Sequence, residues 1–198
     1  MNPPLKLKID LQSLPHKVIR KVLVPEDITM HQLHFVIQDV MGWFNAHLFE
    51  FCDAKWNNTI RVGIPDDFDD DYNTFNTSLR DANDVLLKNT FLEENYAKPF
   101  WYWYDFGDDW WHRISFLKVS KKELNIFAGT PVCIEAKGKC PPEDIGGPWG
   151  YADFLEIIKD KDHPEYEEVR EWHDLEPSEE YDPTETNLEM INSMLGQL

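Results

Sequence analysis

The sequence predicts an α+β fold in one domain, and three observations support it. Its 198 residues suit a single domain. Apolar and charged residues alternate over 5–11, which is typical of a half-buried strand. Aromatic residues fill 100–104, as in strands, and apolar residues recur at helical spacing beyond 150. We divide the domain into 1–63, 64–132 and 133–198.

The first part, 1–63, predicts the order ββαββ. Residues 17–24 form the partner of the first strand. Thr29 and Gln32 make a capping box at the start of a helix, and Gly42 stands where a helix ends. Residues 47–51 and 59–62 predict two further strands. By fold analogy this half resembles a ubiquitin-like roll.

The middle part, 64–132, combines an acidic loop with an aromatic hairpin. Residues 64–78 contain five aspartates and no basic residue, and 77–92 fit either a short helix or a strand entry. Residues 100–104 and 110–119 predict two strands joined at Gly107. Both faces of this hairpin carry apolar side chains, so we expect it in the centre of a mixed sheet, covered on both sides.

The last part, 133–198, is acidic and predicts helices after a Cys-, Pro- and Gly-rich loop. One helix follows residue 150, and a second opens at Pro164. Asp182 and Pro183 predict the cap and first turn of a third helix over about 183–195.

The charge distribution restricts the partners. The chain has 19 basic and 37 acidic residues, net −18, while residues 1–60 are balanced at six of each. Nucleic-acid affinity comes largely from Lys and Arg displacing counterions, so this charge argues against direct DNA or RNA binding. A basic protein partner or a bound cation fits the acidic field, and so does a charge that only maintains solubility.

The sequence also indicates the compartment. No apolar run reaches the length of a membrane span, and the N-terminus does not resemble a signal peptide. Three cysteines, Cys52, Cys133 and Cys140, suit a reducing environment. We therefore expect a soluble, cytoplasmic protein without a membrane partner.

Two motifs carry a family resemblance. Residues 105–112 (DFGDDWWH) resemble a D-F-G-D-x-W-x-H core, and 140–147 (CPPEDIGG) resemble a C-P-P-E-D-x-G-G core. The pattern continues in the segments 33–34, 41–43, 47–51, 150–151, 154–155 and 163–165, and at Trp172. Together these segments are similar to the plasmid Ri Orf3-like domain family (plasmid pRiA4b ORF-3-like) along nearly the whole chain.

The resemblance implies an α+β domain of unestablished function. Some members carry a "TnpR-family passenger" label, which links them to mobile elements and suggests a resolvase. The residues oppose that chemistry, because a serine recombinase needs clustered arginines and a basic tail. Residues 161–198 carry two basic and twelve acidic side chains.

The two motifs supply the candidate functional cluster. If the proline-rich loop folds over the glycine turn, carboxylates and an imidazole converge there, and could bind a divalent metal or act as general acid and base. In the structural alternative, the carboxylates accept backbone N–H groups in turns and the histidine is a core residue. The cluster consists of Asp105, Asp108, His112, Glu143 and Asp144.

Two functional hypotheses remain open. The first is a non-catalytic interaction or binding module, in which Trp149 either packs inside or contacts a partner. The second is a metal-binding protein or metal-dependent hydrolase, with a possible divalent ion as cofactor. Its candidate ligands are Asp108, His112, Glu143, Cys133 and Cys140, although the two cysteines also suit a buried thiol pair or a small disulfide-closed hairpin.

Overall fold

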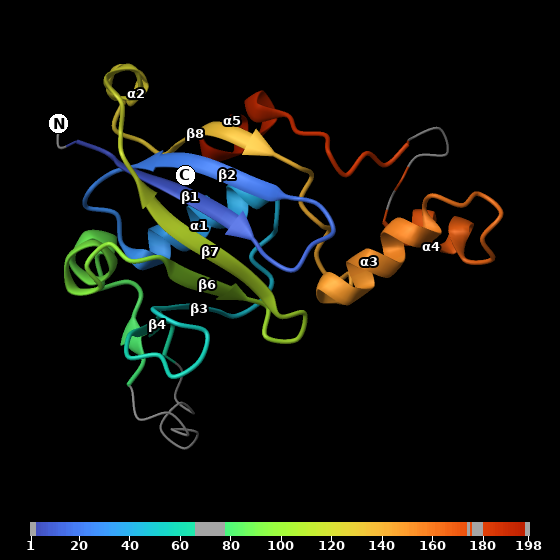
Figure 1. Ribbon diagram of the computed structural model, residues 1–198, viewed down its shortest axis with the longest axis horizontal. Coiled ribbons are helices and arrows are strands. Elements are labelled where there is room, and N and C mark those ends of the chain that lie inside the picture. Colours follow the sequence, from blue (N-terminus) through green and yellow to red (C-terminus); the bar gives the residue numbers. More distant parts are fainter. Residues whose placement is uncertain (1–2, 66–77, 174, 176–179, 197–198) are drawn as a thin grey trace.

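The computed structural model describes residues 3–65, 78–173, 175 and 180–196. Eight strands form one mixed sheet in the order β5-β4-β3-β6-β7-β1-β2-β8. Only the β4–β5 pair is parallel among these strands. The predicted α+β class is confirmed (Figure 1). The strands are β1 Leu5–Leu11, β2 Val18–Val24, β3 Phe49–Cys52, β4 Arg61–Gly63, β5 Arg80–Asp81, β6 Phe100–Tyr104, β7 Trp110–Leu117 and β8 Val132–Lys137.

The N-terminal half contains the predicted ββαββ order, but its strands are separated in the sheet. β1 pairs with β2, and β3 pairs with β4, both antiparallel. The β6–β7 hairpin lies between these two pairs, joining β3 on one side and β1 on the other. The ubiquitin-like detail is therefore not confirmed, because this half completes its sheet only with later strands.

Helix α1 (Met30–Met41) forms for the predicted reasons. The Thr29 side chain accepts a hydrogen bond from the Gln32 N–H, and the Gln32 side chain accepts one from the Thr29 N–H. Gly42 ends the helix with a left-handed φ of 80°. Its apolar stripe is buried against the sheet, and α1 lies behind the strands in Figure 1. His34 makes one contact between this helix and the sheet, because its Nδ1 lies 2.8 Å from the Tyr102 hydroxyl on β6.

The aromatic hairpin differs from the prediction on one face. The face toward α1 is buried, as expected, and includes Tyr102 and Trp110. On the opposite face Trp101, Trp103 and Trp111 are half-buried and Arg113 is exposed. The expectation of two covered faces was wrong because the chain packs α1 on one face only, and the tryptophans shield each other instead. Trp103 and Trp111 stack at 5.0 Å.

The C-terminal part is helical, as predicted, with different boundaries. Tyr151, Phe154 and Leu155 are buried in α3, as the stripe indicated. The last helix begins at residue 188 rather than near 183, because the Asn187 side chain caps it while Asp182 holds a separate turn at Thr184. The helices are α2 Lys121–Ile126, α3 Gly147–Ile157, α4 Tyr166–Trp172 and α5 Leu188–Leu195, with a π-helical segment η1 at Lys88–Glu94.

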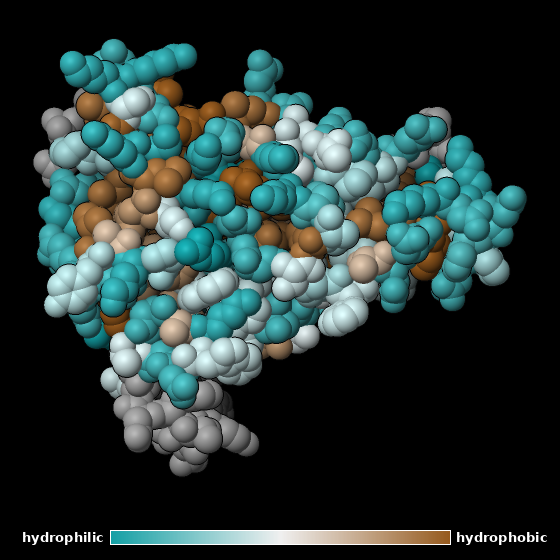
Figure 2. Space-filling view, viewed as in Figure 1, coloured by the Kyte–Doolittle hydropathy of each residue, from teal (hydrophilic) through white to brown (hydrophobic). Residues whose placement is uncertain are grey.

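The open face of the sheet is chemically mixed. Figure 2 shows hydrophilic side chains interspersed with hydrophobic patches over the strands. Lys55 lies over the rings of Trp101 and Trp111 on this face, at 4.6 and 4.9 Å. The acidic loop predicted at 64–78 lies almost entirely outside the described residues. Within the described ranges, no helix is both long and apolar enough to cross a membrane.

Candidate functional site

Two motif loops meet at one end of the hairpin. The DFGD turn (residues 105–109) joins β6 to β7, and the CPPED loop (residues 140–147) leads into α3. Asp105 and Asp109 both adopt positive φ, at 51° and 60°, which Asp tolerates better than most residues. Asp105 Oδ1 accepts the N–H groups of Gly107 and Asp108, so one oxygen of this carboxylate holds the turn.

A glycine allows the loops to touch. The Gly146 N–H donates to Asp108 Oδ2 at 3.1 Å. Gly147 follows at φ 69°, and a Cβ built there would lie 2.2 Å from the Asp108 carbonyl oxygen. No larger residue fits this approach, so the contact between the two motifs requires glycine at 147, while Gly146 suits its position through its left-handed φ of 83°.

Glu143 fastens the CPPED loop to the sheet and to the segment after α1. Its Oε1 accepts from the Tyr104 hydroxyl at 2.5 Å, and its Oε2 accepts from the Phe44 N–H at 2.6 Å. The Trp43 indole N–H donates to the Pro141 carbonyl at 2.9 Å. We call Glu143, Tyr104 and Phe44 the latch. Burial, together with the bond to Glu143, raises the pKa of Tyr104.

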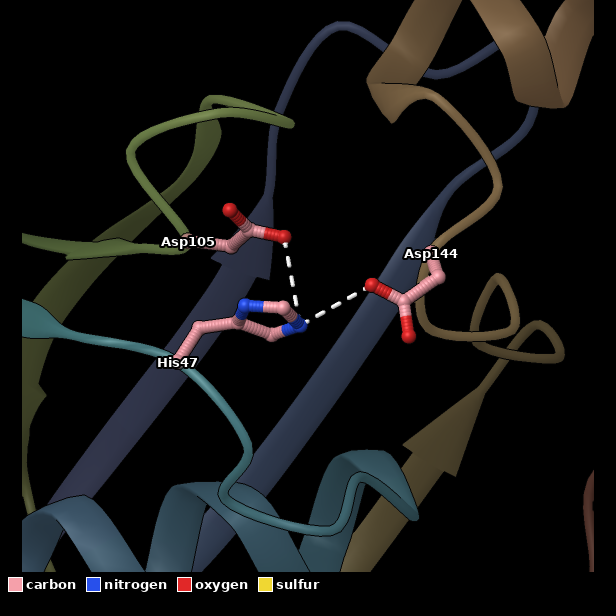
Figure 3. A group of neighbouring side chains, drawn as sticks. All are labelled: His47, Asp105 and Asp144. Carbon is pink, nitrogen blue, oxygen red and sulfur yellow. Dashed lines mark ion pairs between the residues drawn. The ribbon is translucent and has the colours of Figure 1, made fainter.

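Beside the latch lies a group that we call the His–Asp cluster: His47, Asp105 and Asp144. His47 Nε2 is 3.0 Å from Asp144 Oδ1 and 3.6 Å from Asp105 Oδ2 (Figure 3). The Nε2 atom is buried, yet it makes no aligned hydrogen bond with any residue that the structure describes. All three donor atoms lie within 4.8 Å of one another. Asp105 is 8% exposed, whereas the Asp144 side chain is 68% exposed, so the cluster opens to solvent on one side.

His112 lies in the core. It is fully buried between aromatic rings, with Trp43 at 5.3 Å and Tyr102 at 5.1 Å. Neither ring nitrogen makes an aligned hydrogen bond with the described residues, although the nearby backbone of Tyr102 and Trp110 favours the protonated ring. Desolvation lowers the pKa of His112 to about 3, which keeps the ring neutral. The structure therefore places His112 apart from the carboxylates of the predicted cluster.

The three cysteines lie in different elements: Cys52 in β3, Cys133 in β8 and Cys140 at the start of the CPPED loop. Cys52, Cys133 and Cys140 are free thiols, and burial raises the pKa of Cys140 to about 12. Arg20 lies nearby and donates through Nε and Nη1 to four backbone carbonyl oxygens. Among the described residues, the His–Asp cluster is the one group with metal-ligand geometry. The predicted metal set Asp108, His112, Glu143, Cys133 and Cys140 is not gathered into such a group.

A cleft of about 760 Å³ borders the same loops, between the end of α1, the CPPED loop and α5. Asp39 lines it, and the Oδ2 atom of that residue is buried without a hydrogen-bond partner. Desolvation raises the pKa of Asp39. Four carboxylates line the cleft: Asp39, Glu143, Asp144 and Glu185. Its apolar side chains include Phe44, Pro142, Trp172, Met190, Ile191 and Met194.

Sequence reasoning found part of this site. Asp105 and Asp144 do lie together, and Asp108 accepts the Gly146 N–H across the two loops. Glu143 bonds to Tyr104 and Phe44 instead. His47 and Asp39 were missed. The available signal for His47 was its place in the segment 47–51 of the family pattern. Trp149 is 86% exposed, so it is not the packing anchor that the glycines around it suggested. Its role as a partner contact stays a prediction.

The fold and the site define an α+β protein in which two sequence motifs close one end of an antiparallel hairpin. The chain belongs to the plasmid pRiA4b ORF-3-like protein family, whose profile matches residues 4–190. It is similar to the uncharacterized protein y4hQ of Sinorhizobium fredii, with 36% identity over 193 residues, 98% of this chain and 91% of that protein. It also resembles the crystal structure of a protein of unknown function, MM3350 of Methanosarcina mazei Go1. That likeness has a TM-score of 0.74 and 30% identity, and covers 94% of this chain and 96% of the other.

Proposed function

We propose that this protein is a non-catalytic interaction module whose cleft receives a basic segment of a partner protein. The observation that supports the proposal is the composition of the cleft. Four carboxylates surround apolar side chains that are exposed in this chain, with Phe44 at 85%, Trp172 at 75% and Met190 at 63%. Aromatic and methionine side chains are enriched at protein interfaces, and methionine adapts to different apolar partners.

The charges of the cleft favour a cationic ligand. Arg20 is buried and its Nε and Nη1 are committed to backbone carbonyls, and the Lys139 ammonium lies over the Tyr181 ring at 4.5 Å. Asp39 lines the cleft, and its Oδ2 has no donor among the described residues; a Lys or Arg of the partner can pair with this carboxylate once the side chain turns toward the cleft. We therefore expect the partner protein to present one large apolar side chain between basic residues.

The experiment compares two short peptides by fluorescence anisotropy. One has Trp and Leu flanked by lysines, and the other has glutamates in place of the lysines. We expect saturable binding of the basic peptide alone, weakened by salt because exposed ion pairs are screened. The variants Met190→Ala and Asp39→Asn should each weaken it by at least about fivefold, which corresponds to roughly 1 kcal/mol.

The matched control is Glu156→Gln on α3, which removes an acidic group outside the cleft. It should bind the basic peptide like the natural protein. Equal binding of both peptides, or an equal loss of affinity in Glu156→Gln and Asp39→Asn, would contradict the proposal, because the attraction would then be general and not made by the cleft.

A further inference from the structure

We propose that the His–Asp cluster is a binding site for one divalent transition-metal ion, with His47, Asp105 and Asp144 as its ligands. This inference goes beyond the proposed interaction function and does not depend on it. The residues come from three separate segments: His47 before β3, Asp105 after β6 and Asp144 in the CPPED loop. The fold brings them together at the end of the hairpin (Figure 3).

The first argument is the state of the imidazole nitrogen. A buried polar atom normally has a hydrogen-bond partner, because leaving it without one costs about 1–3 kcal/mol. His47 Nε2 is buried and lies 3.0 and 3.6 Å from two carboxylate oxygens, yet no hydrogen bond is aligned with it. A cation between the nitrogen and the carboxylates satisfies all three atoms at once.

The second argument is distance. Metal–ligand bonds of about 2.0–2.2 Å place neighbouring ligand atoms roughly 3.0–3.5 Å apart. The two separations from Nε2 are 3.0 Å and 3.6 Å, the second slightly longer than this range, and the three donor atoms lie within 4.8 Å of one another. The remaining adjustment is a rotation of Asp144, whose side chain is 68% exposed and free to move.

The third argument is that the two carboxylate oxygens of Asp105 have different roles. Its Oδ1 holds the turn through two backbone N–H groups, while its Oδ2 faces His47. The turn therefore fixes the orientation of the free oxygen, as hydrogen bonds to metal-binding side chains do in other metal sites. A second fixed contact, from the Gly146 N–H to Asp108, holds the loop that carries Asp144.

The ligand chemistry selects the ion. One imidazole and two carboxylates suit Zn²⁺, Mn²⁺ or Fe²⁺, whereas Mg²⁺ and Ca²⁺ favour oxygen ligands alone. Three protein ligands and an open, solvent-facing side leave positions for water. Within this class Zn²⁺ binds N/O sites more tightly than Mn²⁺.

The test is titration of chelator-treated protein with ZnCl₂, MnCl₂ and MgCl₂, followed by equilibrium dialysis and elemental analysis. We expect one Zn²⁺ per chain, weaker Mn²⁺ binding and no saturable Mg²⁺ binding. Removing a residue that only orients a metal ligand typically costs 10–100-fold in metal affinity, so loss of a direct ligand in His47→Gln or Asp144→Asn should cost at least about 100-fold. Asp144→Asn should leave the fold intact, because the Asp144 side chain is largely exposed. A loss of metal binding in this variant is therefore not a loss of folding.

Three controls separate this site from other metal ligands. His163→Gln and Asp162→Asn, two residues of an outlying loop, should leave Zn²⁺ binding unchanged. The double variant Cys133→Ser/Cys140→Ser should also bind Zn²⁺ normally, and the Co²⁺-loaded protein should show no thiolate charge-transfer band. The inference is overturned by the absence of saturable binding, by unchanged binding in both His47→Gln and Asp144→Asn, or by loss of binding in the cysteine variant.

Asp144 lines the cleft as well, so the two proposals are separated by variants of residues that belong to one site alone, Met190→Ala for the cleft and His47→Gln for the metal site. The metal titration contains no peptide, and Met190→Ala should bind Zn²⁺ like the natural protein. Loss of peptide binding with intact metal binding would contradict only the proposed function. The reverse result would contradict only the metal site.

Discussion

Glu143 and Asp144 are neighbours in the chain, but they belong to two regions of opposite character. In the latch, both oxygens of Glu143 accept short hydrogen bonds, from Tyr104 and from the Phe44 backbone. In the His–Asp cluster, Asp144 faces His47 without an aligned bond and extends into solvent. Within one motif, therefore, one carboxylate stabilises the fold and the next remains available for a ligand.

The largest effect is expected where the loops touch. Gly147→Ala forces a Cβ to within 2.2 Å of the Asp108 carbonyl and places alanine at φ 69°. The overlap and the left-handed backbone together should cost at least about 3 kcal/mol of the free energy of unfolding. Thermal denaturation should show a fall of about 6 °C or more. Gly196→Ala, at a position with room for a Cβ, is the control and should change the melting temperature little.

Two buried histidines should make the free energy of unfolding depend on pH. Desolvation lowers the pKa of His112 to about 3 and that of His34 to about 4. The unfolded chain therefore binds more protons below pH 6.5, and stability falls as the pH drops from there toward the folded-state pKa values. Each histidine contributes a loss of roughly 2 kcal/mol between pH 7 and pH 5.

His112→Phe isolates one of these contributions. Phenylalanine keeps a flat ring at this position but cannot take up a proton, so urea denaturation at pH 7 and pH 5 should show a smaller pH dependence, by roughly 2 kcal/mol. An identical pH dependence in the variant and the natural protein would mean that His112 is solvated or hydrogen-bonded in solution.

A smaller effect is expected in the latch. Glu143→Gln keeps the side-chain shape but puts an amide where two oxygens accept hydrogen bonds from Tyr104 and Phe44. We expect a loss of about 1–2 kcal/mol in the free energy of unfolding. Combining it with Tyr104→Phe should cost less than the sum of the two changes, since both remove the same bond. Strict additivity in this double-mutant cycle would show that the two groups do not interact.

The smallest effect on stability is expected at Asp144. Asp144→Asn changes an exposed side chain, and Asn tolerates its backbone angle of φ 58°. In metal-free buffer, its free energy of unfolding should stay within about 0.5 kcal/mol of the natural protein. A loss as large as that of Glu143→Gln would assign both carboxylates to stability and remove the distinction between the two regions.

The sequence predicted the elements whose signals are local. The alternation in β1, the capping box at Thr29 and Gln32, and the Gly42 terminus all act within a few residues, and all are confirmed. The start of α5 was misplaced because Asp182 and Asn187 both offer capping side chains, and only the packing of the later residues decides between them.

The remaining differences come from contacts between distant residues. An apolar pattern on both faces of the hairpin cannot show where the chain will place its helices, so the open face with Trp101, Trp103 and Trp111 was not predictable. Likewise, the two motifs indicated that Asp105 and Asp144 belong to one site. His47 lies 58 residues before Asp105, and only the folded sheet brings it to them.

The order of strands also has a consequence for synthesis. The β1–β2 hairpin leaves the ribosome first, yet its two outer edges pair with β7 and β8, which follow about a hundred residues later. At roughly 5–20 residues per second, both edges stay unpaired for about 5–20 s on each nascent chain. An unpaired apolar edge is a template for association with other chains. The edges of the nascent hairpin therefore stay open to association with other chains until β7 and β8 emerge.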